Sequence, residues 1–142
     1  MGDYRFLEDV ALADCAMDVE GADPADLFET AARALAEVMV DPATVRTTVR
    51  RSIALEAAEL DLLLYDWLSE LIFRKDRDGE VYTCTRVAIE GSGPFRLSAE
   101  VEGGTLDPAH VELRSDPKAV TFHQFALACV DGRWRARIVI DI

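Results

Sequence analysis

The chain has 142 residues, of which 50% are hydrophobic and 30% are charged, so its composition is that of a globular protein rather than of a disordered segment. Its formal net charge is −12, which disfavours direct strong binding of nucleic acid because a surface of this sign repels phosphate. A basic protein or a hard cation suits this charge better. The N-terminal residues lack a basic segment followed by an apolar run, and acidic residues interrupt the apolar stretch 60–73. We therefore expect a cytoplasmic protein that makes no contact with a membrane.

Neither a repeat nor a linker divides the chain, so we expect a single domain over residues 1–142. Apolar and polar residues alternate over 13–19, which predicts a strand with Cys15 and Met17 on one face and Asp14 on the other. A helix is predicted next, because Asp23 can cap its first turn and Pro24 suits its first position. Its apolar residues recur every three or four positions to Met39, and Asp41-Pro42 ends it.

The middle and end of the chain contain further strands and a second helix. Residues 45–55 are rich in Val, Thr and Ile and predict a strand, and residues 60–73 have the apolar spacing of a helix. Two more strands are predicted over 82–89 and 95–101. Asp131-Gly132 lies between FALACV and RWRARIVIDI and predicts a hairpin that joins the last two strands of the chain. The fold class expected is α+β, a single-domain sandwich whose mainly antiparallel sheet carries two amphipathic helices on one face.

The last strand ends with two adjacent carboxylates. Alternation places Ile138, Ile140 and Ile142 on one face and Asp141 on the other. The α-carboxylate of Ile142 adjoins Asp141, and neighbouring carboxylates repel unless a proton or cation lies between them. If Asp14 lies alongside, three anionic groups converge, a set that suits Ca²⁺ or Mg²⁺ and suits zinc poorly because it contains neither His nor Cys. The alternative is an edge strand whose polar end is simply solvated.

Four segments in order along the chain resemble the archease family: residues 63–71 (LLYDWLSEL), 107–110 (DPAH), 118–123 (KAVTFH) and the terminal Asp141-Ile142. The likeness extends from Phe6 to the last residue. It implies an archease-like fold and an accessory protein of the GTP-dependent RNA ligase that acts in tRNA splicing and RNA repair. In that family the accessory protein promotes guanylylation of the ligase and allows multiple turnovers; it is not itself the ligase.

The resemblance also implies roles for particular residues. Asp14, Asp141 and Ile142 correspond to the family's ligands for a divalent cation, Ca²⁺ or Mg²⁺. The segment FLEDVALAD before this site is two residues longer than the family's pattern and lacks its His and Thr. Four further residues are candidates to support the ligase-facing site: Lys118, His123, Asp107 and His110. The alternatives are that Lys118 is a solvated strand end and that His123 is a hydrogen-bonded structural residue.

Two other functions stay open at this point. A stand-alone metal-dependent hydrolase would use the same carboxylates with His123 as base, but the chain contains no HExxH, GxSxG or glycine-rich phosphate loop followed by Lys. We therefore expect an accessory protein rather than an enzyme. The second is a chaperone-like modulator of a tRNA methyltransferase, a role that the resemblance also implies and that would require an apolar surface patch.

Overall fold

A computed structural model describes residues 2–7 and 14–142. These residues form, in chain order, β1 (Asp3–Leu7), β2 (Asp14–Gly21), α1 (Pro24–Met39), a 3-10 helix η1 (Pro42–Thr44), β3 (Val49–Ala57), α2 (Leu60–Asp78), β4 (Glu80–Glu90), β5 (Phe95–Thr105), β6 (Ala119–Val130) and β7 (Arg133–Asp141). Among them, no helix is both long and apolar enough to cross a membrane.

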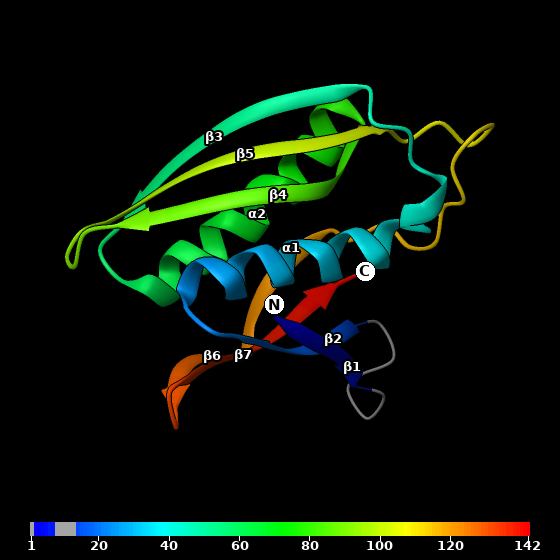
Figure 1. Cartoon of the computed structure of the whole chain (residues 1–142). Coiled ribbons are helices and arrows are strands. Elements are labelled where there is room, and N and C mark those ends of the chain that lie inside the picture. Colours follow the sequence, from blue (N-terminus) through cyan, green and yellow to red (C-terminus); the bar gives the residue numbers. More distant parts are fainter. Residues whose placement is uncertain (1, 8–13) are drawn as a thin grey trace.

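The strands form two antiparallel sheets, one in the order β1-β2-β7-β6 and the other in the order β3-β5-β4. Figure 1 shows the two helices lying between these sheets. Helix α1 packs against β2 and β4, and α2 packs against β6, β3 and β4. The predicted α+β class with antiparallel strands and two helices is confirmed. The strands divide into two sheets rather than one, so the helices contact both.

Local signals explain the first helix. The Asp23 carboxylate accepts a hydrogen bond from the backbone N–H of Asp26 at 2.8 Å, and Pro24 is the first helical residue, as predicted. The second helix was predicted to end at residue 73 but continues to Asp78. Its last turn is charged rather than apolar, and it ends where Gly79 adopts a left-handed φ of 65°. Hydrophobic periodicity therefore underestimated its length.

Strand boundaries differ from the prediction in several places. Strand β3 begins at Val49 rather than at 45, because η1 follows α1 and residues 45–48 connect it to the strand. Strands β4 and β5 extend beyond the predicted 82–89 and 95–101. Strand β1 was not predicted, and Ala13 lies outside the described residues. The predicted hairpin is confirmed, since Asp131 and Gly132 both have the positive φ that a tight β-hairpin turn requires.

The hydrophobic core lies between the two sheets and determines the register of the strands. Ile138 and Ile140 of β7 and Met17 of β2 are fully buried, and burial of one such side chain stabilises the fold by about 1.5–3 kcal/mol. The indole N–H of Trp67 in α2 donates a hydrogen bond to the carbonyl of Phe28 in α1 at 3.0 Å. A shift of β7 by one residue would expose its buried row to solvent, so the pairing of β2 with β7 has a unique register.

Candidate functional site

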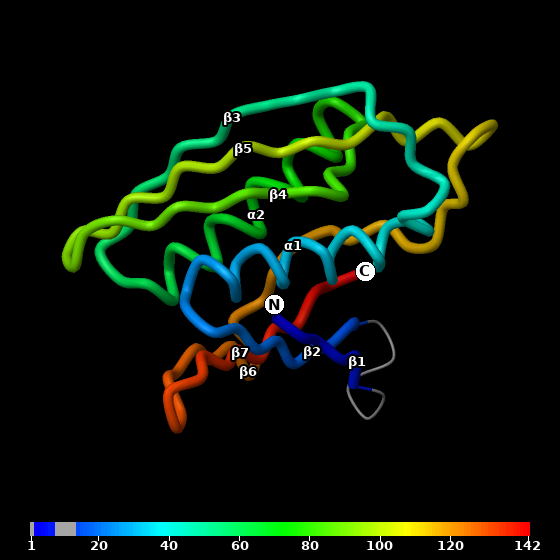
Figure 2. The backbone as a smooth tube through the Cα atoms, in the orientation of Figure 1, coloured from blue at the N-terminus to red at the C-terminus, as the bar shows by residue number. Residues whose placement is uncertain are grey.

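Strands β2 and β7 bring Asp14 and Asp141 together. The register of this antiparallel pair places Asp14 directly opposite Asp141, and Figure 2 shows the two strands side by side near the C-terminus. Directly opposed residues have their Cβ atoms about 4.5–5.5 Å apart on one face of the sheet. Both aspartates are half-buried. The two carboxylates, here called the Asp14–Asp141 pair, therefore share one small region at the end of the sheet.

Other acidic side chains on these two strands are neutralised. Arg137 donates two hydrogen bonds to the Asp18 carboxylate, at 2.9 and 3.0 Å, and Glu20 pairs with Arg135 at 3.1 Å. The hydrogen bond from Arg137 outweighs partial burial and holds the pKa of Asp18 below its usual value. Within residues 2–7 and 14–142, neither member of the Asp14–Asp141 pair forms an ion pair or a side-chain hydrogen bond. The negative charge of the pair is left uncompensated by this part of the chain.

Lys118 lies beside the Asp14–Asp141 pair. Its backbone N–H donates a hydrogen bond to the carbonyl of Asp141 at 2.7 Å, and its side chain is exposed. Ile142, half-buried, follows Asp141 directly. Of the residues singled out from the sequence, Asp141 is therefore the direct neighbour of Asp14, and Ile142 and Lys118 adjoin Asp141. Lys118 lies on the side of β7 away from β2.

A buried lysine anchors the segment that leads into Lys118. The side chain of Lys75 in α2 is 6% exposed and pairs with Asp76 at 2.9 Å. Its ammonium group also contacts the carboxylate of Asp116 and the carbonyl of Pro117. Burial alone lowers the pKa of Lys75, but the hydrogen bonds to Asp116 and Asp76 outweigh it, so the net pKa is raised and the ammonium stays charged. Lys75 thereby ties α2 to the chain just before Lys118.

The remaining candidates lie elsewhere. His123 is exposed in an irregular part of β6, where pairing with β7 breaks between Thr121 and Ala126. Asp107 and His110 follow β5 and contact each other, with 2.7 Å between the His110 Nδ1 and the carboxylate. The backbone N–H of Ala109 and then His110 lower the pKa of Asp107. Among the described residues, no hydrogen bond or ion pair joins His123, Asp107 or His110 to the Asp14–Asp141 pair.

The oxygen donors at the pair suit a hard cation. No three His, Cys, Asp or Glu side chains in the described part of the chain converge to hold a metal ion. Two carboxylates supply only part of the six to eight oxygen ligands that Ca²⁺ takes, so the α-carboxylate of Ile142, carbonyls or water would have to complete the set. The predicted approach of Asp14 to Asp141 is present. The segment before Asp14 that differs from the family's pattern falls largely at residues 8–13, outside the described residues.

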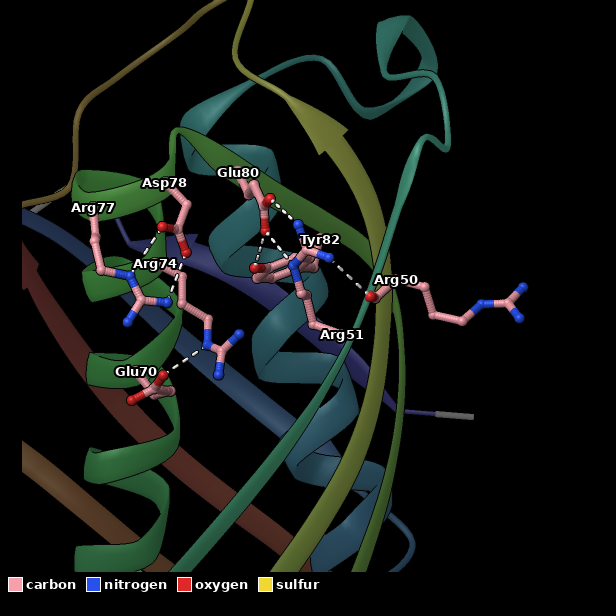
Figure 3. A network of polar contacts seen from close by, with 8 residues as sticks. All are labelled: Arg50, Arg51, Glu70, Arg74, Arg77, Asp78, Glu80 and Tyr82. Atoms are coloured by element: carbon pink, nitrogen blue, oxygen red, sulfur yellow. Dashed lines mark hydrogen bonds and ion pairs between the residues drawn. The ribbon is translucent and has the colours of Figure 1, made fainter.

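A second group of charges, which sequence reasoning missed, surrounds Glu80. Glu80 is 5% exposed and accepts hydrogen bonds from Arg51 at 2.8 Å and from the Tyr82 hydroxyl at 2.6 Å (Figure 3). Burial raises the pKa of Glu80, but these two donors outweigh it and bring the pKa below its usual value. Burial and the bond to Glu80 raise the pKa of Tyr82 to about 12, so the hydroxyl remains a donor. Two further ion pairs adjoin this group: Arg74–Glu70 and Arg77–Asp78. Because every carboxylate here has an arginine, we interpret the group as structural.

An aromatic patch covers the junction of α2 and β6. Tyr65 and Phe122 stack with their ring centroids 4.3 Å apart, and Phe125 packs edge-on against both. Phe122 is nevertheless 62% exposed. We call Tyr65, Phe122 and Phe125 the aromatic patch. Phe122 and Phe125 lie in the irregular segment of β6, where pairing with β7 is interrupted. Apolar alternation in the sequence did not indicate this interruption.

The archease family model, described as the Archease protein family, matches residues 4–142. The chain belongs to the archease family. An archease of Methanothermobacter thermautotrophicus is 34% identical over 143 residues, which covers 100% of both chains. An archease of Thermococcus gammatolerans is 35% identical over 132 residues, covering 92% of this chain and 93% of that one. The family resemblance seen in the sequence is therefore confirmed.

Solved structures of archeases share the fold. The solution structure of Methanobacterium thermoautotrophicum protein 1598 matches with a TM-score of 0.80 and 30% identity, over 98% of both chains. The crystal structure of a Thermotoga maritima archease, described as a possible chaperone, matches with a TM-score of 0.65 over 97% of this chain and 98% of that one. At 16% identity, the second match shows the fold alone.

Proposed function

We propose that this archease is a non-enzymatic activator of a GTP-dependent RNA ligase in tRNA splicing and RNA repair. It promotes guanylylation of the ligase and multiple turnover through a divalent-cation site formed by Asp14, Asp141 and the α-carboxylate of Ile142. The observation that carries the proposal is the direct opposition of Asp14 and Asp141 across β2 and β7. Two uncompensated carboxylates at this spacing favour a cation between them.

The residues of the chain have separate tasks in this proposal. A bound Ca²⁺ or Mg²⁺ would supply a positive charge able to attract a phosphate or carboxylate oxygen of the ligase complex. The buried rows of β2 and β7 hold the donor oxygens on rigid strands. Lys118, whose backbone N–H is bonded to Asp141, is exposed, and its ammonium suits an acidic group on the ligase or its nucleotide. The net charge of −12 speeds encounter with a basic RNA-binding enzyme without competing for its RNA.

Ligation by a matched ligase, compared under single-turnover and multiple-turnover conditions, tests the proposal. Asp14→Ala, Asp141→Ala and a form extended beyond Ile142 should each lose stimulation, and binding of Ca²⁺ by calorimetry should weaken in parallel. Asp18→Ala is the matched control, because Asp18 lies on the same strand and face but is already paired with Arg137. It should retain cation binding.

The outcomes separate the parts of the proposal. Full stimulation of the ligase by both aspartate variants would show that the cation site is not needed for activation. Full stimulation by the extended form would remove only the α-carboxylate of Ile142. Loss of stimulation in Asp18→Ala, with its fold intact, would show that the whole face matters rather than the pair.

The aromatic patch favours one second function, a chaperone-like modulator of a tRNA methyltransferase. An exposed stacked Phe122 is a surface that another protein can cover. We expect a candidate methyltransferase to remain soluble in the presence of the wild-type protein but not of Phe122→Ser. Equal solubility with both proteins would remove the patch from this role.

A further inference from the structure

A cleft lies far from the Asp14–Asp141 pair. Strands β2 and β7 run from the pair at one end to Gly21 opposite Trp134 at the other, a distance of about 23 Å at 3.3 Å per residue. Here the first turns of α1 and α2 meet the β4–β5 loop and the β6–β7 hairpin, at the left of Figure 1. They enclose an open cleft of about 760 Å³.

The lining of this cleft is apolar and acidic. Its large apolar residues are Leu60, Ile89, Phe95, Leu127 and Trp134, all of them half-buried. Asp23, Glu59 and Asp61 provide three carboxylates, and no Lys or Arg lines the cleft among the described residues. The arginines on either side of Trp134 in the sequence pair with Glu20 instead. No sequence pattern indicates this site, because its residues come from five separate parts of the chain.

The helix ends reduce this negative charge only partly. Each helix N-terminus carries a partial charge of about +0.5, so two of them offset roughly one of the three carboxylates. Asp23 accepts a hydrogen bond from Asp26, and Asp61 accepts one from Leu62. Glu59, at the N-cap of α2, makes no side-chain capping bond and is exposed. Its carboxylate is available to a ligand.

We propose that this cleft binds a segment of a partner protein that presents a bulky apolar side chain flanked by Lys or Arg. The apolar side chain would cover Trp134 and Leu127, and the flanking cations would pair with Glu59 and Asp61. The cleft is open, with an exposed rim, which suits a peptide segment better than an enclosed small molecule. This docking site goes beyond the proposed cation site and does not depend on it, since the two lie at opposite ends of β7.

Intrinsic fluorescence offers a direct assay. Of the two tryptophans, Trp67 is fully buried and Trp134 lines the cleft, so binding should change the emission of Trp134 alone. The probes are the capped peptides Gly-Arg-Arg-Leu-Phe-Arg-Arg-Gly and Gly-Glu-Glu-Leu-Phe-Glu-Glu-Gly, titrated at low salt. The basic peptide should bind at least tenfold more tightly than the acidic one.

Substitutions in the full chain make the test specific. The double variant Glu59→Gln, Asp61→Asn should weaken binding of the basic peptide about tenfold, because exposed ion pairs are worth up to about 1 kcal/mol each. The control Asp66→Asn, Glu112→Gln removes the same charge from exposed positions outside the cleft and should change affinity less than twofold. Thermal melts should show both variants folded.

Four results would overturn the proposal. These are equal binding of the two peptides, unchanged affinity in the Glu59→Gln, Asp61→Asn variant, and an identical Trp134 response to spermidine alone, which would assign the cleft to a small organic cation. The fourth is concentration-dependent dimerisation that Leu127→Ser abolishes, which would assign the cleft to a second copy of the chain.

Discussion

Two groups of carboxylates in this protein are built in opposite ways. Glu80 lies buried beside α2, and the chain supplies Arg51 and Tyr82 as partners for it. Asp14 and Asp141 lie opposite each other at the end of a sheet, where the described residues supply no cation within ion-pairing distance. Paired charges of the first kind support the fold. The second kind favours a positive charge that comes from outside the chain.

Substitution of Glu80 should show the largest effect on stability. Glu80→Ala removes the acceptor of the buried Tyr82 hydroxyl and the partner of Arg51, and we expect the free energy of unfolding to fall by about 3 kcal/mol. Urea denaturation measures this loss of unfolding free energy. The control Glu102→Ala breaks a surface pair with Arg50, whose side chain is 74% exposed, and should cost about 0.5 kcal/mol or less. Similar losses in the two variants would contradict the structural role of the Glu80 group.

Lys75→Met should have the next largest effect. The methionine keeps the apolar stem but leaves the carbonyl of buried Pro117 without its ammonium donor, at a cost of about 2 kcal/mol. Amide hydrogen exchange should also accelerate at Lys118, whose N–H is bonded to Asp141. Unchanged exchange at Lys118, despite lower stability, would show that Lys75 does not position the segment beside the Asp14–Asp141 pair.

Acid should abolish the contribution of Asp18. Because Arg137 lowers the folded-state pKa of Asp18, its stabilisation is present above the unfolded-state pKa and is lost as the pH falls through the folded value. Asp18→Asn should therefore be about 1 kcal/mol less stable than the wild type at neutral pH. The difference should shrink steadily below about pH 4. A difference that stays constant down to pH 2 would mean that packing, rather than charge, accounts for it.

Without added metal, Asp14→Asn should produce the smallest change in stability, and this change should have the opposite sign. Removing one of two facing like charges should raise the free energy of unfolding by about 0.5 kcal/mol or less. Millimolar Ca²⁺ should raise the melting temperature of the wild type, because a ligand that binds only the folded state stabilises it, and should leave the variant unchanged. A similar Ca²⁺ shift in both proteins would place the cation elsewhere.

Local patterns were sufficient to predict much of the fold. The N-cap at Asp23, the hairpin at Asp131-Gly132 and the alternation of β7 are each encoded within a few residues. All three are present, except that Val139 on the other face of β7 is also buried. The opposition of Asp14 and Asp141 could be anticipated because both positions end strands and because the archease resemblance linked them. Their role in cation binding stays a prediction.

What the sequence did not indicate depends on distant contacts. In the sequence, Glu80 is an ordinary charged residue after a turn. Arg51 reaches it only because β3 and β4 both pair with β5. Strand β1 is short, lies at a sheet edge and has Phe6 41% exposed, so it lacks the burial pattern of an internal strand. The break in β6 near His123 coincides with the stacking of Phe122 on Tyr65 of α2, a contact that the residue types of β6 alone do not reveal.

The pairing of Asp14 with Asp141 also has a consequence for the order of folding. Strands β2 and β7 lie far apart in the sequence but pair side by side, so a long loop must close before the two aspartates can meet. Contacts between residues so distant in sequence form slowly. We therefore expect the Asp14–Asp141 pair to be assembled late in folding.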